Sequence, residues 1–284
     1  MRAAVMLDPA EEPTAANDAA APAVCEAGAS LVAAGAIAPV LGARDLVKRY
    51  SGLVVTNNVD IDLRAGEIHA LVGPNGAGKS SLLAQLSGEV RADAGRIDFQ
   101  GRDITRLPPY RRAQLGIART FQITSIFLEM TVLENVSVAV QVRQGHSFRF
   151  WKKVGRDASV LARARELLER VGLSDHAGRL ASELSHGQHR QLEIAIALAG
   201  EPKALLLDEP MAGMGLEDSA RLTRLLQSLK GSVAMLFVEH DMDAVFALAD
   251  RITVLVYGQR VVTGTPAEIR SNAEVRRAYL GDLS

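Results

Sequence analysis

The chain has 284 residues, enough for one large or two modest domains, and 48% of them are hydrophobic, which suffices for a sizeable core. Its formal net charge of −1 excludes a global basic field of the kind that attracts nucleic acid. The one cysteine, Cys25, has no partner for an intramolecular disulfide, in agreement with a reducing compartment.

Residues 1–42 differ in composition from the rest of the chain. They contain fifteen alanines, one basic and five acidic residues, and no sustained amphipathic pattern, which predicts a disordered extension. Acidic residues stand where a secretion signal would need its apolar part. The longest weakly polar stretch, residues 31–43, is too short to span a bilayer and contains Pro39. We therefore expect a cytosolic protein that reaches a membrane only through a partner.

The domain itself is expected over residues 43–284. Short alternating runs predict a small antiparallel layer. These runs contain Leu46, Tyr50, Val59, Ile61, Leu63, Ile97 and Phe99. Three continuously apolar runs, at 68–72, 204–207 and 233–238, are typical of parallel strands covered on both faces. Helical spacing at 131–142 and 159–171, where Leu161 and Ala164 begin an apolar stripe, indicates a helical subdomain inserted at about residues 123–200.

A glycine-rich segment at residues 73–80 follows the first apolar run. Its glycines let backbone N–H groups turn toward an anion, and the N-terminus of the next helix adds partial positive charge. Lys79 would reach the β- and γ-phosphates, and the Ser80 hydroxyl would ligate Mg²⁺. The predicted nucleotide-binding residues of this P-loop are Gly73, Asn75, Gly76, Gly78, Lys79, Ser80 and Ser81.

Two acidic residues, Asp208 and Glu209, follow the second apolar run. Their carboxylates are expected at the carboxyl edge of the sheet, where α/β folds bind ligands. Taken alone, such a pair is equally well the start of a solvated loop. Together with a P-loop it indicates phosphoryl transfer, in which Asp208 holds Mg²⁺ through water and Glu209 accepts a proton from the attacking water.

A second anion site is predicted at residues 184–188, with the sequence LSHGQ. Ser185 is a natural N-cap, and the apolar stripe that begins at Leu192 predicts a helix after it. A helix N-terminus with a serine hydroxyl, and with Gly187 permitting close approach, suits a phosphate. Because the chain already has a P-loop, we interpret this second site as belonging to the nucleotide of a neighbouring subunit.

These motifs, in this order, resemble those of the ABC-type ATPases over about residues 43–284. The resemblance implies an α/β fold with a P-loop NTPase (RecA-like) core, an antiparallel β subdomain and an inserted α-helical subdomain. It also implies a head-to-tail dimer, either a homodimer or a heterodimer with a second ABC ATPase subunit, that holds two ATP molecules. Ser185, Gly187 and Gln188 would then contact the ATP that the partner's P-loop binds.

The resemblance assigns three further roles. Gln122 matches the hinge residue whose amide senses Mg²⁺ and the attacking water, His240 matches the histidine that contacts the γ-phosphate, and Tyr50 matches the aromatic that stacks on adenine. By residue type alone these are a polar loop residue, a strand-end surface residue and a packing tyrosine. The proposed catalytic set is Glu209, His240 and Gln122, and the proposed Mg²⁺ site consists of Ser80, Gln122 and Asp208.

Two positions depart from the family pattern. His186 replaces the glycine of the commonest signature, where it either adds a donor near the phosphate or faces solvent. Gly215 stands where many members have a dimer-contacting aspartate, which puts communication between the two ATP sites in question. ATP binding itself does not depend on either position.

Three further segments, at 115–122, 190–195 and 264–281, are similar to those of importers for branched-chain amino acids. Close relatives of these importers carry urea, amides or other small polar solutes. The resemblance implies an ATP-hydrolysing subunit on the inner face of the cell membrane. It would bind transmembrane permease subunits and serve a periplasmic or extracellular solute-binding protein indirectly. The segment Phe148–Lys153 combines aromatic and basic residues and either contacts the membrane or the permease or forms a solvated loop.

Two other functions share the nucleotide motifs. A soluble ABC ATPase that acts on nucleic acid or the ribosome generally has long coiled-coil inserts or two fused nucleotide domains. This chain has one set of motifs and no extended heptads, so we expect no nucleic-acid partner. A non-hydrolysing regulator has no need of Glu209 and His240, and both are present.

Overall fold

The computed structural model describes residues 38–120, 126–144 and 157–275. The strands are β1 (Leu41–Tyr50), β2 (Leu53–Leu63), β3 (Ile68–Val72), β4 (Ala94–Phe99), β5 (Arg102–Asp103), β6 (Ile117–Arg119), β7 (Ala204–Asp208), β8 (Ala234–Val238), β9 (Arg251–Val256) and β10 (Gln259–Gly264). The α-helices are α1 (Lys79–Ser87), α2 (Pro109–Leu115), α3 (Val132–Arg143), α4 (Ala158–Arg170), α5 (His186–Ala199), α6 (Leu216–Leu229), α7 (Met242–Leu248), α8 (Pro266–Ser271) and α9 (Ala273–Val275). Short 3-10 turns lie at Ser174–His176 and Ala181–Glu183.

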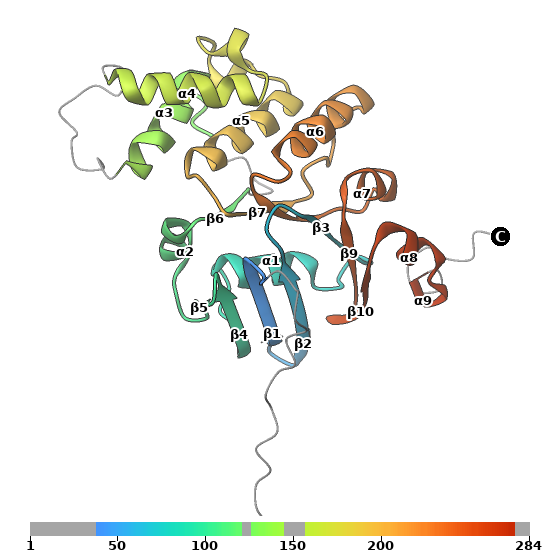
Figure 1. Cartoon of the computed structure of the whole chain (residues 1–284). Coiled ribbons are helices and arrows are strands. Elements are labelled where there is room, and N and C mark those ends of the chain that lie inside the picture. Colours follow the sequence, from blue (N-terminus) through green and yellow to red (C-terminus); the bar gives the residue numbers. More distant parts are fainter. Residues whose placement is uncertain (1–37, 121–125, 145–156, 276–284) are drawn as a thin grey trace, which may run out of the picture. The chain divides into compact units, whose positions relative to one another are not determined.

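The strands form two sheets, as the sequence predicts (Figure 1). The smaller sheet has the order β2-β1-β4-β5 and is antiparallel. The larger has the order β10-β9-β3-β8-β7-β6, in which only β10 runs antiparallel to its neighbour. The α/β class, the antiparallel layer and the parallel core are therefore confirmed. The strands β5, β6, β9 and β10 were not predicted.

The larger sheet is covered on both faces, which explains its continuous apolar runs. In β7, Leu205 and Leu207 belong to a core cluster that also contains buried residues of α3 to α7. Ala204 and Leu206, which point the opposite way, belong to a second cluster with α1 and the smaller sheet. Because successive side chains alternate between two buried faces, every position of such a strand is apolar. The helix α1 thus lies between the two sheets (Figure 1).

The helices α3, α4 and α5 pack against one another to form the helical part of the chain. The capping box of Thr131 and Glu134 starts α3. In α4 the buried stripe contains Ala164, Leu167 and Leu168 as predicted, but it begins at Val160, while Leu161 is half-buried. Val160 fits because positions 160, 164, 167 and 168 share one helix face.

The ordered strand β1 begins at Leu41, inside the range 1–42 that the sequence assigns to the extension. Leu41 pairs with Leu63 and with Phe99 and is buried, and the preceding Val40 N–H donates to the Leu63 carbonyl (2.8 Å). The rest of the predicted extension, up to residue 37, lies outside the described residues. Across the described ranges, no helix has both the length and the hydropathy needed to cross a membrane.

Candidate active site

The P-loop and the acidic pair lie at the carboxyl ends of the parallel strands, together with two charged residues that were not predicted. The P-loop begins at Gly73 directly after β3, Asp208 ends β7, and Glu239 follows β8. Since β8 lies between β3 and β7, these three strand ends are neighbours. Arg119, at the end of β6, adds a cation from the next strand. Parallel strands place their carboxyl ends on one edge, so the sheet assembles the site.

The P-loop needs glycine at two positions because other backbone segments pass close to it. A Cβ on Gly73 would lie 2.0 Å from the Leu255 carbonyl oxygen, and one on Gly78 would lie 2.3 Å from the Val55 carbonyl oxygen. Gly78 also has a φ of 96°, in the left-handed region. The remaining predicted contacts, Asn75, Gly76, Ser80 and Ser81, lie at the open side of the loop or at the first turn of α1.

Lys79 is buried beneath the P-loop that it serves. Its ammonium donates to the carbonyl oxygens of Gly73 (2.7 Å) and Pro74 (3.0 Å). Burial lowers the pKa of Lys79, and the carboxylates of Glu209 and Asp208 act in the opposite direction. The lysine ammonium therefore contacts the P-loop backbone and lies within electrostatic range of the predicted catalytic acids.

Ser80 and Asp208 meet as the predicted Mg²⁺ site requires. The Ser80 hydroxyl donates to Oδ1 of Asp208 at 3.3 Å, and Asp208 is only 3% exposed. The donors are oxygen atoms, which suit a hard cation such as Mg²⁺. The other oxygen of Asp208, Oδ2, accepts a hydrogen bond from Arg119 at 2.9 Å. Sequence reasoning missed Arg119, although its position at the end of an apolar strand was a usable signal.

Glu209 leaves β7 with a sharp change of backbone direction. Its φ of 47° lies in the left-handed region, which costs a residue with a Cβ about 1–2 kcal/mol. Two hydrogen bonds hold this conformation: its N–H donates to Val238 (3.0 Å), and its carbonyl accepts from Ala212 (3.1 Å). The strand register and the following turn therefore set the position of the predicted base.

The next strand contributes a buried carboxylate that the sequence analysis did not single out. Glu239 is 1% exposed, and its Oε1 accepts from the Met211 N–H (2.8 Å) and its Oε2 from the His240 N–H (3.2 Å). Burial raises the pKa of Glu239. The His240 side chain is 61% exposed, with Nδ1 3.8 Å from Oε2 of Glu239. Glu239 thus joins the loop after β8 to the segment after Glu209, and His240 is accessible to a ligand.

Tyr50 lies where the β1–β2 hairpin turns, paired with Leu53. Tyr50 is 46% exposed, and the Lys48 ammonium lies 5.3 Å from the ring centroid. The second strand of the hairpin approaches the P-loop through the Val55 carbonyl beside Gly78. An exposed ring on this hairpin is compatible with stacking on a base, and the adenine contact stays a prediction.

The predicted signature segment opens α5. Ser185 Oγ accepts from the Gln188 N–H (3.3 Å), and Gln188 Oε1 accepts from the Ser185 N–H (2.9 Å), which completes a capping box. A Cβ on Gly187 would lie 2.6 Å from the Asp218 side chain of α6, so glycine allows this packing. In the described part of the chain no hydrogen bond or ion pair joins residues 185–188 to the P-loop. The helices α5 and α1 lie on opposite sides of the larger sheet (Figure 1).

The two departures from the family pattern meet in the same region. His186 Nε2 lies 3.2 Å from the Ala212 carbonyl oxygen, so the imidazole contacts the segment after Glu209, an outcome that the sequence analysis did not consider. Gly215 is the N-cap of α6, and a Cβ there would meet no atom within 4 Å. Two predicted features, Gln122 and Phe148–Lys153, lie outside the described residues.

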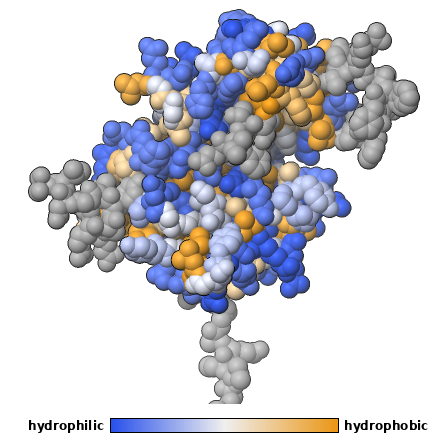
Figure 2. Space-filling model, turned by 180° about the vertical axis from the view of Figure 1, so that it is seen from behind, coloured by the Kyte–Doolittle hydropathy of each residue, from blue (hydrophilic) through white to orange (hydrophobic). Residues whose placement is uncertain are grey.

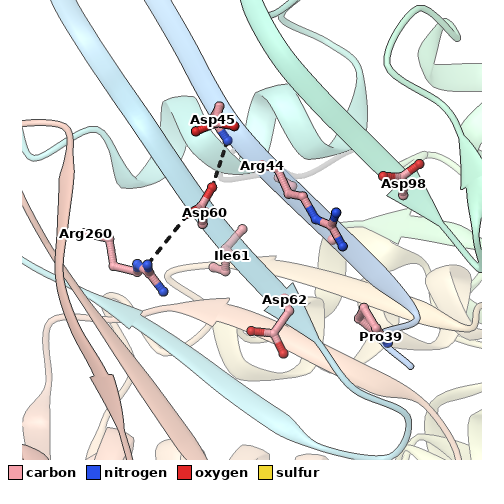
Figure 3. A pocket seen from close by; sticks show the side chains of 10 residues that line it. Pro39, Arg44, Asp45, Asp60, Ile61, Asp62, Asp98 and Arg260 are labelled. Carbon is pink, nitrogen blue, oxygen red and sulfur yellow. Dashed lines mark hydrogen bonds and ion pairs between the residues drawn. The ribbon is translucent and has the colours of Figure 1, made fainter. Parts of the chain in front are cut away.

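A cavity of about 320 Å³ lies away from this site, on the outer surface of β1 and β2 (Figure 3). Its acidic residues are Asp45, Asp60, Asp62 and Asp98. Asp60 accepts from the Asp45 N–H (2.8 Å) and lies 3.7 Å from Arg260, as Figure 3 shows, and Asp62 pairs with Arg251 (2.8 Å). Asp98 likewise pairs with Arg96 (2.7 Å). Because arginines balance three of these carboxylates, the cavity offers no concentrated charge for a phosphate or a metal ion.

A P-loop after the core strand β3, an acidic pair at the end of β7, two positions away in the same sheet, and an inserted helical part together define a P-loop nucleoside triphosphatase. Residues 56–212 match the ABC transporter family, and residues 259–282 match the branched-chain amino acid ATP-binding cassette transporter family. The chain belongs to the ABC transporter family.

Individual relatives agree with this assignment over most of their length. The high-affinity branched-chain amino acid transport ATP-binding protein LivG of Salmonella typhimurium is 40% identical over 251 residues, covering 86% of this chain and 98% of LivG. The lipopolysaccharide export system ATP-binding protein LptB of Haemophilus influenzae is 33% identical over 244 residues, covering 86% and 98%. A solved ATP-binding cassette of an ABC transporter in its ADP conformation has a TM-score of 0.76 at 30% identity, covering 86% and 100%.

Proposed function

We propose that this chain is the ATP-hydrolysing subunit of an ABC transporter that takes up branched-chain amino acids or a related small polar solute. The observation that carries the proposal is the approach of Ser80 Oγ to Asp208 Oδ1, at 3.3 Å, beside the buried Lys79. This arrangement combines a phosphate cradle with oxygen donors for Mg²⁺ in one edge of a sheet. ATP binding and hydrolysis are the activity of the family to which the chain belongs.

Each residue of the site has its own proposed role in ATP binding or hydrolysis. Lys79 and the P-loop N–H groups would hold the β- and γ-phosphates, and Ser80 and Asp208 would hold Mg²⁺, which when bound would supply positive charge beside the phosphates. Glu209 accepts the proton of the attacking water, and His240 donates to the γ-phosphate. Gln122 is proposed to sense the metal and the water, and Tyr50 to stack on the adenine.

The position of the signature segment supports a dimeric ATP site. Ser185, Gly187 and Gln188 lie at the N-terminus of α5, across the larger sheet from α1 and its P-loop. A second copy or a related ABC subunit, arranged head to tail, would bring this helix N-terminus to the partner's γ-phosphate.

The helical part of the chain is the proposed contact with the transmembrane permease subunits. Figure 2 views the molecule from behind and shows hydrophobic residues gathered over the helical part of the chain on this side. Large apolar side chains exposed in the helical part are Phe127, Leu128, Val142 and Leu180. Docking there would hold the subunit on the inner face of the cell membrane, where a solute-binding protein acts on it only through the permease. The segment Phe148–Lys153 belongs to the same proposal.

Branched-chain amino acids are the favoured cargo for two reasons. LivG, whose name specifies this cargo, is 40% identical, and residues 259–282 match a family that is specific to branched-chain amino acid transporters. LptB shows that a cassette with 33% identity serves lipopolysaccharide export instead. The nucleotide site alone therefore does not determine the cargo.

The test is reconstitution with the permease subunits and binding protein in vesicles, followed by ATP turnover and uptake of labelled leucine. Glu209→Gln is expected to bind ATP, accumulate a closed dimer and lose hydrolysis and uptake by at least about a hundredfold, the scale of losing a catalytic base. The matched control is Glu217→Gln, an exposed acid at the start of α6, which should keep both activities. Normal turnover in Glu209→Gln refutes the assigned base. If the reconstituted complex hydrolyses ATP but takes up no labelled leucine, the assignment of the cargo is refuted.

A further inference from the structure

The guanidinium of Arg119 bridges two carboxylates that come from distant parts of the sequence. Its NH2 group donates to Oδ2 of Asp208 at 2.9 Å, and its NH1 group donates to Oε2 of Glu89 at 2.8 Å. The Arg119 and Asp208 side chains are 10% and 3% exposed, whereas Glu89 is 32% exposed. Because the pair with Asp208 is nearly dry, water screens it less than the pair with Glu89.

This bridge determines which oxygen of Asp208 faces the metal site. Arg119 occupies Oδ2, and the other oxygen, Oδ1, is the one that the Ser80 hydroxyl approaches at 3.3 Å. A carboxylate held at one oxygen by a planar guanidinium cannot rotate freely about its last bond. Oδ1, the oxygen that points at Ser80, is therefore kept in place. Arg119 does not compete with a metal-bound water for this oxygen, because the arginine donates to Oδ2.

The other end of the bridge reaches a cavity of about 270 Å³ between the sheet edge and the helical part of the chain. Its lining includes Glu89 and Arg119 and, from α5, Ile196 and Ala197. The Ser87 hydroxyl, also in the lining, donates to Oε1 of Glu89 (3.0 Å) and accepts from Arg119 (3.3 Å). A chain of polar contacts thus runs from the cavity wall to the carboxylate of the metal site.

We propose that Arg119 is a positioning residue that aims Oδ1 of Asp208 at the Mg²⁺ site and makes this orientation depend on Glu89 at the cavity wall. The inference rests on the proposed function, because the metal belongs to that function. Its consequence is that a change at Glu89, which does not touch the metal site, alters metal affinity through Arg119. Groups around a metal ligand commonly change affinity by 10–100-fold when they are removed.

Charge and orientation make opposite predictions for substitutions of Arg119. If Arg119 acted only through its positive charge, Arg119→Gln would strengthen cation binding, and Arg119→Lys would leave it unchanged. If it acts by orientation, both variants weaken binding, because neither lysine nor glutamine has the planar guanidinium whose NH1 and NH2 groups reach Glu89 and Asp208. The sign of the Arg119→Gln effect therefore separates the two explanations.

The experiment measures Mn²⁺ binding by electron paramagnetic resonance on the full chain with a non-hydrolysable ATP analogue. We expect affinity about tenfold weaker in both Arg119→Lys and Arg119→Gln, with analogue binding in the absence of metal unchanged. Glu89→Ala is expected to weaken Mn²⁺ binding about threefold in the wild-type background and to have no further effect in Arg119→Lys. Glu183→Ala is the matched control, because it removes the exposed ion pair with Arg179 (3.2 Å) elsewhere on the chain.

Different results of this experiment would overturn different parts of the proposal. Tighter Mn²⁺ binding in Arg119→Gln, or unchanged binding in Arg119→Lys, overturns the orienting role. An equal effect of Glu89→Ala with and without the arginine overturns the connection to the cavity wall. If Arg119→Gln does not fold, the conservative Arg119→Lys and Glu89→Ala variants still decide both points. Failure of the proposed function itself looks different, because the wild-type chain would then bind neither the analogue nor Mn²⁺ with it.

Discussion

His69, in the strand that leads to the P-loop, should make the stability of the chain depend on pH. Its side chain is fully buried, with Nδ1 2.9 Å from the Asp62 carbonyl oxygen and Nε2 2.8 Å from the Thr253 hydroxyl. Since a carbonyl only accepts, the neutral ring donates from Nδ1 and accepts at Nε2. Thr253 then receives its own hydrogen bond from Thr263 (2.7 Å).

The magnitude follows from the pKa. Burial, followed by the charge of Arg251, lowers the pKa of His69 from 6.5 to about 4. The folded chain therefore resists a proton that the unfolded chain accepts, so stability is complete above pH 6.5 and falls as the pH drops toward 4. The loss is about 2 kcal/mol at pH 5 and about 3 kcal/mol at pH 4. Against a typical total of about 5–15 kcal/mol, this is a large fraction.

The assay compares wild type with His69→Asn in urea titrations followed by circular dichroism at pH 7 and pH 5. Asparagine keeps a donor for the Asp62 carbonyl and does not titrate, although it loses the contact with Thr253. The advantage of wild type in unfolding free energy should shrink by about 2 kcal/mol between the two pH values, because all other titrating groups are shared. Parallel pH profiles for the two proteins would refute the assignment of a buried neutral histidine.

Three further predictions concern the frame of the active site. Gly78→Ala should lower the affinity for a fluorescent ATP analogue at least about a hundredfold, because the new Cβ would lie 2.3 Å from a backbone oxygen and φ at this position is 96°. The control is Gly178→Ala, which should bind the analogue normally because a Cβ there would meet no atom within 4 Å. Arg112→Leu should lower the unfolding free energy by about 3 kcal/mol or more in a urea titration, since the buried guanidinium donates to four backbone carbonyls, two of them at the end of α1. Glu239→Ala should reduce ATP turnover, because two backbone N–H groups lose their acceptor. Glu239→Gln keeps an acceptor oxygen and should retain much of the turnover. Equal turnover in the two variants would contradict this role.

Much of the architecture could be predicted because the informative patterns are local. The run at 204–207 became β7, the P-loop stands between β3 and α1, and Ser185 caps α5. Such features depend on neighbours within a few residues, where steric and hydrogen-bonding rules act directly. The stripe of α4 was misjudged at Leu161 because residue type does not reveal which of two adjacent apolar side chains faces the core.

The sequence by itself determined the presence of a phosphate cradle, an acidic pair and a signature helix, since each is a contiguous motif. Only the tertiary structure decided which of these residues meet. The sheet order places β8 between β3 and β7, which brings Glu239 to Met211, and the edge position of β6 brings Arg119 to Asp208. The physical reason is that strand order and packing, rather than separation along the chain, set the neighbours of a side chain at the edge of a sheet.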